Sequence, residues 1–287
     1  MNYKLDEKEN KFRFEKSNLN FAVIGHNEWI NFLELESLPK PGIITHSKRS
    51  IELPAGGGSV IAKRLLELTK GKVHFFTSLG NDYYGKESFK ILKGMGLNLH
   101  VAWRDIPTRK GFSLIDSKKE RSIIIIGERL EPRFNDNLRW EILSEMDGIF
   151  ITAGDEKLFT KARMSRVLCT TPRVGIKVIN KSQVLIDGLI GSNLDPGENY
   201  KLSDLDLKPK LIIKTEGEKG GISFPGGRFS SLKSRKEIDS YGCGDSFAAG
   251  IIYGLASKWS IEKTLTLGKV LGRNCIEHFG PYSNSKK

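Results

Sequence analysis

The chain has 287 residues, of which 38% are hydrophobic and 28% are charged, so it can hold one large α/β core with an appendage or two small domains. Its formal net charge of +12 would attract anions of any kind. The basic residues come with no recognisable nucleic-acid-binding module, however, and we expect no nucleic acid partner. Residues 1–19 form a charged tail without an apolar run, which excludes a signal peptide or a membrane span there.

The cysteines indicate the compartment. Cys169, Cys243 and Cys275 have no paired spacing, so they predict neither a disulfide framework nor a zinc site. Disulfide-free chains are typical of reducing compartments. We therefore expect a cytoplasmic protein without a membrane partner.

Strand-like and helix-like segments alternate from Asn20 to Gly280 with only short loops between them. This alternation predicts one α/β domain over residues 20–287, a doubly wound, mostly parallel sheet with helices on both faces. Within it, residues 43–53 and, in residues 98–116, the two stretches 98–103 and 110–116 look strand-like without helices between them. We expect these stretches to form a small β-sheet lid over the active site.

Two nucleotide-binding motifs are almost present and are rejected. Residues 80–87 nearly spell a P-loop after a strand, but Glu87 stands where a Ser or Thr hydroxyl would bind Mg²⁺. No Gly-x-Gly-x-x-Gly follows the first strand, because Gly25 leads into His26 and Asn27. We expect His26, which has no second ligand at metal spacing, to orient a hydrogen bond.

Two glycines and a carboxylate stand at the start of a predicted helix near the C-terminus. An apolar stripe at every fourth residue marks this helix: Phe247, Ile251 and Leu255. Gly242 and Gly244 would let an anion approach the unpaired N–H groups of the first turn. Asp245 in that turn is placed to take a proton from a hydroxyl that attacks a phosphoryl group. The alternative is that Asp245 caps the helix and the glycines close a tight turn.

Residues 239–250 resemble the C-terminal signature of the ribokinase-like, or PfkB, family of carbohydrate kinases. Six blocks occur in the family's order: residues 20–25, 54–59, 75–85, 107–108 with 120–126, 211–220 and 239–250. The resemblance implies ATP-dependent phosphorylation of a hydroxyl on a sugar or sugar-like small molecule, assisted by Mg²⁺. A monovalent cation such as K⁺ and a homodimer through the lid are further expectations.

The resemblance also assigns roles by position. It implies a catalytic base at Asp245 and an anion hole at Gly242, Cys243 and Gly244, with Cys243 a small filler rather than a reactive thiol. Asp239 belongs either to a monovalent-cation site or to a structural turn contact. The implied nucleotide contacts are Lys214, Thr215, Gly217, Gly220 and Asn274. The implied acceptor contacts are Glu28, Asn31, Gly56 and Gly57.

Departures from the family pattern concern the acceptor and the metal. Ile30 stands where the family carries a sugar-binding Asp, so Glu28 or Asn31 would have to replace it. Asn-x-x-Glu becomes residues 193–196 with Pro in the Glu place, which leaves Asp195 or Glu198 for Mg²⁺. The basic surplus leaves room for an acceptor that already carries a phosphate. These departures also keep a second interpretation open, a ligand-binding or regulatory protein with weak or no kinase activity.

Overall fold

The computed structural model describes residues 4–6, 11–234 and 236–282. Their largest element is a nine-stranded sheet in the order β15-β14-β13-β12-β11-β10-β3-β6-β7. The strands from β13 to β7 run parallel, and at one edge β14 pairs antiparallel with both β13 and β15. The strands are β3 (Phe21–Ile24), β6 (Val73–Gly80), β7 (Asn98–Arg104), β10 (Gly148–Ile151), β11 (Val167–Thr170), β12 (Gly188–Ser192), β13 (Leu211–Thr215), β14 (Gly221–Phe224) and β15 (Gly227–Phe229).

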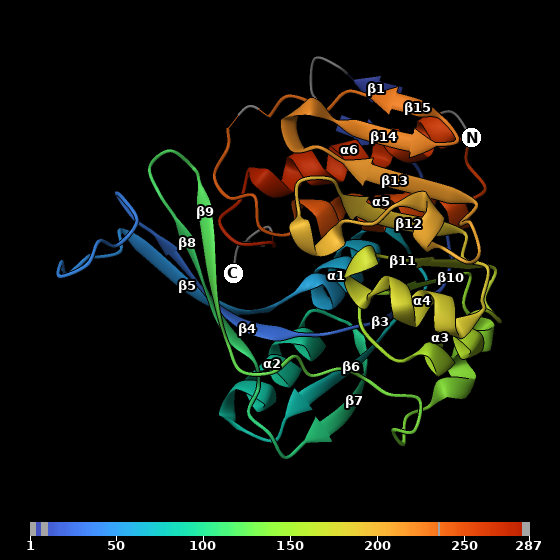
Figure 1. The fold of residues 1–287 in the computed structure, drawn as a ribbon, viewed down its shortest axis with the longest axis horizontal. Coiled ribbons are helices and arrows are strands. Elements are labelled where there is room, and N and C mark those ends of the chain that lie inside the picture. The colour runs from blue at the N-terminus through green and yellow to red at the C-terminus, as the bar shows by residue number, and fades with distance from the viewer. Residues whose placement is uncertain (1–3, 7–10, 235, 283–287) are drawn as a thin grey trace.

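Helices cover both faces of this sheet, as predicted (Figure 1). One face carries α1 (Gly57–Leu68), α2 (Tyr83–Gly94), α5 (Cys243–Ala256) and α6 (Ile261–Ile276). The other carries the 3₁₀ helix η1 (Trp140–Glu145), α3 (Glu156–Ala162) and α4 (Ile176–Ser182). Shorter 3₁₀ turns are η2 (Pro172–Val174), η3 (Pro196–Glu198), η4 (Leu202–Asp204) and η5 (Gly217–Lys219). Among the described residues, no helix combines the length and the hydrophobicity that a membrane span requires.

Strand β3 shows why the core has two halves. All four of its residues are buried, and successive side chains point to opposite faces of the sheet. Phe21 and Val23 therefore join the apolar cluster under α1, α5 and α6, whereas Ala22 and Ile24 join the cluster under η1, α3 and α4. A strand buried on both faces reads as a continuous apolar run, which is typical of parallel sheets.

The lid is a separate four-stranded sheet in the order β5-β4-β8-β9, which projects from the main domain in Figure 1. Its strands are β4 (Glu28–Glu34), β5 (Arg49–Ala55), β8 (Lys110–Ile115) and β9 (Arg121–Ile126).

The lid prediction needs two corrections. Residues 98–103 are not in the lid, because α2 intervenes between β6 and β7 and returns the chain to the main sheet, where β7 pairs with β6. In the stretch 43–53, the strand begins only at Arg49. Strands β4 and β9, which complete the lid, were not assigned to it from the sequence.

The N-terminal stretch is more ordered than a charged tail over residues 1–19 implies. Strands β1 (Lys4–Asp6) and β2 (Lys11–Arg13) pair antiparallel, and residues 1–3 and 7–10 of the predicted tail lie outside the described residues. The ring of Phe14 packs edge-on against Tyr253, and the backbone N–H of Ser17 donates to the Tyr253 hydroxyl. From Phe14 onward, the chain therefore packs on the main domain.

Candidate active site

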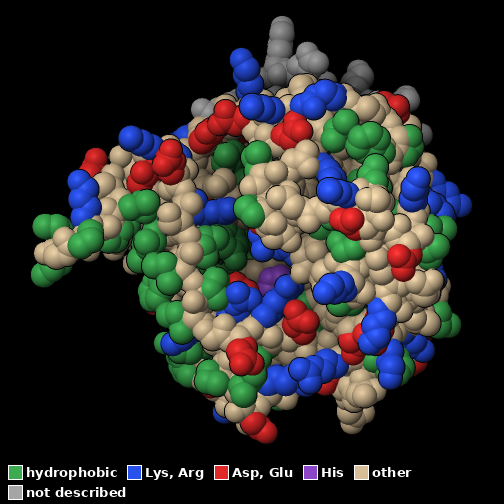
Figure 2. Space-filling model, in the orientation of Figure 1, with side chains coloured by type: hydrophobic (Ala, Val, Ile, Leu, Met, Phe, Trp, Pro, Cys, Tyr) green, Lys and Arg blue, Asp and Glu red, His purple; other side chains and the backbone are tan. Residues whose placement is uncertain are grey.

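A cavity of about 820 Å³ lies between the lid and the carboxyl ends of the parallel strands. Figure 2 shows the corresponding hollow, with a histidine on its floor and basic side chains around it. In the sheet, β6 lies on one side of β3 and β10 lies on the other, so the order of the strands reverses at β3. Ligands of open α/β sheets bind at such a reversal of strand order. His26 after β3 and Thr152 after β10 line the cavity at this point.

The predicted glycine turn and carboxylate face this cavity. Helix α5 begins at Cys243, and its N-cap residue Gly242 has φ +78°, in the left-handed region that glycine tolerates best. A Cβ on Gly242 would come within 2.9 Å of Pro281, whereas a Cβ on Gly244 would meet nothing within 4 Å. The fold therefore requires a glycine at position 242, and the open space beside Gly244 is cavity.

Asp245 lies in the first turn of α5 and lines the cavity. Burial raises its pKa to about 6, and the negative charge of Glu198 adds to the effect, while Arg173 and Arg121 oppose it. A carboxylate of this pKa is largely ionised at pH 7 and still basic enough to accept a proton in a transition state. The ideal Cβ position of Gly57 is 2.8 Å from Asp245 Oδ1, so the start of α1 approaches this carboxylate closely.

The acceptor side of the cavity contains three of the four residues assigned to it. Gly56, Gly57 and Glu28 line the cavity. Glu28 is buried, with its Oε1 3.2 Å from Arg109 Nη1 and 3.8 Å from His26 Nε2. Burial raises the pKa of Glu28 although the neighbouring arginines act in the opposite direction. Asn31 does not line the cavity, because alternation along β4 turns it to the opposite face of the lid from Glu28.

The nucleotide side contains two of the five assigned residues, Thr215 and Gly217. Lys214 is turned away from the cavity: its Nζ donates to the Tyr200 carbonyl at 3.2 Å and lies 4.2 Å from the centre of the Tyr200 ring. Gly220 closes the turn between β13 and β14. Asn274 on α6 accepts a hydrogen bond from Arg273, and it does not line the cavity either.

Both carboxylates assigned to Mg²⁺ line the cavity and pair with one arginine. Arg173 Nε lies 2.9 Å from Glu198 Oε1, and Arg173 Nη2 pairs with Asp195 Oδ2. Glu198 Oε2 also accepts from the Ser192 backbone N–H at 2.6 Å. No group of three or more His, Cys, Asp or Glu side chains among the described residues is arranged to hold a metal ion.

Two further assigned residues have local partners. Both carboxylate oxygens of Asp239 accept backbone N–H groups, from Tyr241 at 2.8 Å and from Gly280 at 3.0 Å. These are the structural turn contacts that stood beside the cation site as an alternative. For Cys243, a hydrogen bond with Cys275 and burial raise the pKa well above its usual value, which is unfavourable for a reactive thiolate.

The five basic side chains that line the cavity were missed as site residues: His26, Arg109, Arg121, Arg129 and Arg173. Arg129 donates to His26 Nδ1 at 3.0 Å and to the Thr152 carbonyl. Burial and the arginines lower the pKa of His26 well below its usual value, so the ring is neutral. A signal existed, because Arg109 and Arg121 adjoin or lie within residues 107–108 and 120–126, two of the blocks that resemble the family.

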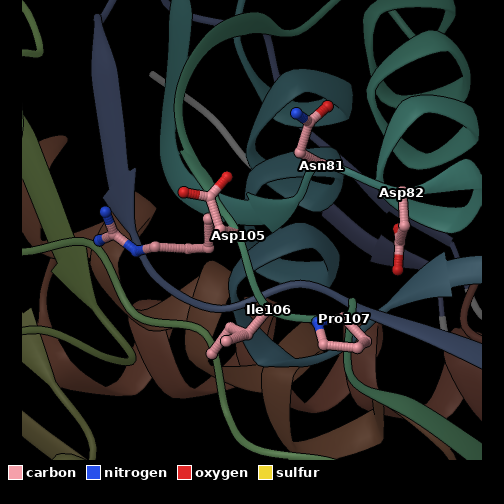
Figure 3. Close-up of a pocket in the computed structure, with 6 residues that line it drawn as sticks. Asn81, Asp82, Asp105, Ile106 and Pro107 are labelled. Atoms are coloured by element: carbon pink, nitrogen blue, oxygen red, sulfur yellow. The ribbon is translucent and has the colours of Figure 1, made fainter.

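The near-P-loop segment forms a smaller cavity of about 220 Å³, seen close up in Figure 3. Its lining comes from the segments that follow β6 and β7. Asp82 caps α2 by accepting from the Gly85 N–H, and it also accepts from the backbone N–H and the hydroxyl of Thr108. The carboxylate therefore holds the loop that leads to Arg109, which agrees with the rejection of a P-loop.

Comparison with known proteins shows which family the C-terminal part of the chain resembles and which fold the chain adopts. Residues 200–287 match the model of the pfkB family of carbohydrate kinases. The adenosine kinase from Sinorhizobium meliloti has a TM-score of 0.75 at 16% identity, covering 93% of this chain and 96% of that one. The C-terminal part of the chain thus resembles the PfkB family in sequence, and the described residues have the fold of the ribokinase-like structural neighbours. The predicted fold class is confirmed.

Two other similar proteins show how far this similarity extends. The Arabidopsis thaliana ribokinase, solved with ribose and ATP, has a TM-score of 0.71 at 20% identity, covering 91% of this chain and 94% of that one. At such identities the likeness concerns the fold. The ATP-dependent 6-phosphofructokinase of Thermoanaerobacterium thermosaccharolyticum is 31% identical over 108 residues, which are 37% of this chain and 33% of that protein. The chain thus spans about a third of the length of this curated relative.

Proposed function

We propose that the protein is an ATP-dependent phosphotransferase that phosphorylates a hydroxyl of a sugar or sugar-like small molecule. The observation that carries this proposal is the position of Asp245. It lies in the first turn of α5, beside the open space at Gly244, with a pKa of about 6. A base and an anion site within one helical turn are what phosphoryl transfer to a hydroxyl requires.

The chemistry follows from these groups. Asp245 accepts the proton of the acceptor hydroxyl as its oxygen bonds to the γ-phosphorus, and the bond from that phosphorus to the β–γ bridging oxygen breaks to release ADP. The N–H groups of residues 242–244 stabilise the charge on the transferred phosphoryl group, because the helix N-terminus is preorganised for an anion. Thr215 and Gly217 border the nucleotide, and the lid closes over both substrates to exclude water.

Mg²⁺ is part of this proposal. Asp195 and Glu198 supply the carboxylate oxygens that Mg²⁺ prefers, and Mg²⁺ is usually held by one or two carboxylates together with substrate phosphates. The ion would neutralise charge on the phosphates of ATP. Because both carboxylates pair with Arg173, we propose that they hold the ion only together with ATP. We propose no monovalent-cation site at Asp239, because both of its carboxylate oxygens accept backbone N–H groups.

We also propose a homodimer through the lid and a cytoplasmic location. Ile124 and Ile126 lie on the lid face opposite Ile123 and Ile125, which line the cavity, and they are 52% and 47% exposed. Strand β9 is an edge strand, which invites pairing. Light scattering should give a dimer for the parent and a monomer for Ile124→Lys, with Ile44→Lys, in an exposed loop, as the control.

The three free cysteines support the cytoplasmic location.

An ATP-consumption screen tests the enzyme activity. The parent and Asp245→Asn are each incubated with ATP, Mg²⁺ and a panel of sugars, sugar phosphates, sugar acids and nucleosides, and acceptor-dependent ADP release is measured. We expect turnover by the parent and its loss in the variant, with the exposed Asp206→Asn as control. If ATP binds and no acceptor is turned over, the alternative of a ligand-binding or regulatory protein applies, and the pairing of Arg173 with both metal candidates favours that alternative.

A further inference from the structure

Three arginines gather on the acceptor side of the cavity. Arg109 lies just before β8 and Arg121 is the first residue of β9, so both belong to the lid, while Arg129 follows β9 and reaches the floor. They come from different turns of the chain and converge on one space. Arg121 shares its face of β9 with Ile123 and Ile125, the two isoleucines that line the cavity.

The positive charge on this side exceeds the negative charge. Glu28 is the one carboxylate that pairs with Arg109 among the described residues, and the Nε of Arg109 is buried without a hydrogen-bond partner there. Arg121 has no acidic partner in the described part of the chain, and its guanidinium lies 5.5 Å from the centre of the Tyr241 ring. The Nη2 of Arg129 donates to His26 Nδ1 and to the Thr152 carbonyl, and its Nε is 3.2 Å from Glu131 Oε1.

The other carboxylates of the cavity do not offset this surplus. Asp195 and Glu198 pair with Arg173 near the end of β12. Asp245 makes no ion pair among the described residues, although the charge of Arg121 acts to lower its pKa.

Thr215, which borders the proposed nucleotide site, ends β13, and β13 is four strand positions from β3. At about 4.8 Å per strand, that is a separation of about 19 Å across the sheet. Arg129, which donates to His26 just after β3, therefore lies on the acceptor side, and Arg109 joins it there through Glu28, which is 3.2 Å from Arg109 and 3.8 Å from His26.

We propose that the acceptor carries a phosphate of its own, held by Arg109, Arg121 and Arg129, while its free hydroxyl faces Asp245. The substrate class is a sugar phosphomonoester. This inference rests on the proposed kinase function. A phosphate dianion matches guanidinium groups both in charge and in geometry. Its three terminal oxygens offer more acceptors than the carboxylate of a sugar acid to the Nε of Arg109, which has no partner among the described residues, and to the guanidinium of Arg121. In this arrangement, Glu28 orients a hydroxyl of the acceptor and also holds the Arg109 side chain in place.

The proposal has a direct test in matched acceptor pairs. We would measure kcat and KM with fructose 6-phosphate and ribose 5-phosphate, with fructose and ribose, with gluconate, and with adenosine and inosine. We expect KM for at least one phosphorylated sugar to be 100-fold or more below that of its unphosphorylated parent. Arg109→Gln and Arg121→Gln should each raise that KM by about 10- to 100-fold, because a hydrogen bond to a charged group is lost. Arg139→Gln, in an exposed ion pair, is the control and should not change it.

A second readout does not depend on turnover. The same sugar phosphate, without ATP, should raise the midpoint of thermal unfolding of the parent and should do so much less for Arg109→Gln. Equal efficiency with unphosphorylated sugars, nucleosides or gluconate would overturn the proposal and leave the kinase function standing. A rise in KM for ATP alone in the arginine variants would overturn it too, because they would then hold the nucleotide. Stabilisation by the sugar phosphate without any turnover would instead overturn the kinase function and leave the phosphate site intact.

Discussion

The two sides of the cavity are built on different parts of the molecule. The transfer side, Gly242 to Asp245, belongs to the first turn of α5, which packs on the nine-stranded sheet and on α6. The acceptor side takes Glu28, Arg109 and Arg121 from the four-stranded lid, which contacts solvent on both faces at β9. Under the proposed function, this difference places the chemistry on the main domain and the choice of acceptor on the lid. Changes on α5 should therefore lower kcat, and changes in the lid should raise the KM of the acceptor.

The largest expected effect comes from the base. Asp245→Asn removes the proton acceptor, which typically lowers the rate by about 10²–10⁴-fold, while the amide keeps the size of the side chain. ATP affinity measured by calorimetry should change little. A variant that retains more than half of the parent's kcat on the true acceptor would contradict the assignment.

The same variant separates a catalytic role from a helix cap. Because the pKa of Asp245 is raised to about 6 in the folded protein, its contribution to stability is highest below the unfolded value near 4 and falls as pH rises through 6. The ionised carboxylate thus destabilises the fold at pH 8, by roughly 1–3 kcal/mol. Asp245→Asn should unfold at a higher temperature than the parent at pH 8, and the difference should shrink toward pH 4. A capping carboxylate predicts the opposite sign, since its loss costs about 1 kcal/mol.

The next largest effect distinguishes the two glycines. Gly244→Val places its branches in open cavity space, so we expect kcat to fall by about 10–100-fold with stability nearly unchanged, since the phosphoryl position is crowded. Gly242→Val has a Cβ 2.9 Å from Pro281 and a φ of +78°, so it should destabilise the fold by roughly 1–3 kcal/mol. Kinetics and thermal unfolding of both variants check the pair. A Gly244→Val enzyme with weak ATP binding and full kcat at saturation would assign the glycine to ground-state binding.

The sequence predicted the α5 side of the cavity better than the lid side. The α5 turn is contiguous, so a helical stripe and two glycines sufficed to place Asp245, and the alternation of strands and helices sufficed for the doubly wound sheet. The arginines could not be placed in this way, because Arg109, Arg121 and Arg129 meet only after β8 and β9 fold over the cavity. The assignment of Lys214 to the nucleotide was wrong for a local reason. Strand alternation along β13 and the contact with the Tyr200 ring turn its side chain away from the cavity. The lid was predicted in part, since α2 was not recognised between β6 and β7.

A tenfold effect is expected from pH. Asp245 must be ionised to accept a proton, and its pKa is about 6, so only about a tenth of the enzyme is active at pH 5. The kcat/KM for the acceptor, which reports groups of the enzyme before the acceptor binds, should therefore rise about tenfold from pH 5 to a plateau near pH 7.5. The residual profile of Asp245→Asn on the same acceptor separates the titration of Asp245 from that of an acceptor phosphate, which also titrates near pH 6. A flat profile from pH 5 to pH 8 would mean that Asp245 is not the group that takes the proton.

The smallest effect tests the two faces of β4. Glu28 and Asn31 were both candidates for the missing sugar-binding carboxylate, but only Glu28 lines the cavity, where it is buried beside Arg109. Glu28→Gln keeps the shape and removes the charge, so it should weaken acceptor hydrogen bonds by about 1 kcal/mol and raise the acceptor KM about fivefold. Asn31→Ala, on the opposite face of the same strand, is the matched control and should leave KM and kcat unchanged. Steady-state kinetics with the acceptor found in the screen provide the measurement. If Asn31→Ala raises KM and Glu28→Gln does not, then the lid turns its other face to the acceptor. The assignment of acceptor choice to the cavity face of the lid would then be wrong, whereas the assignment of proton transfer to Asp245 would stand.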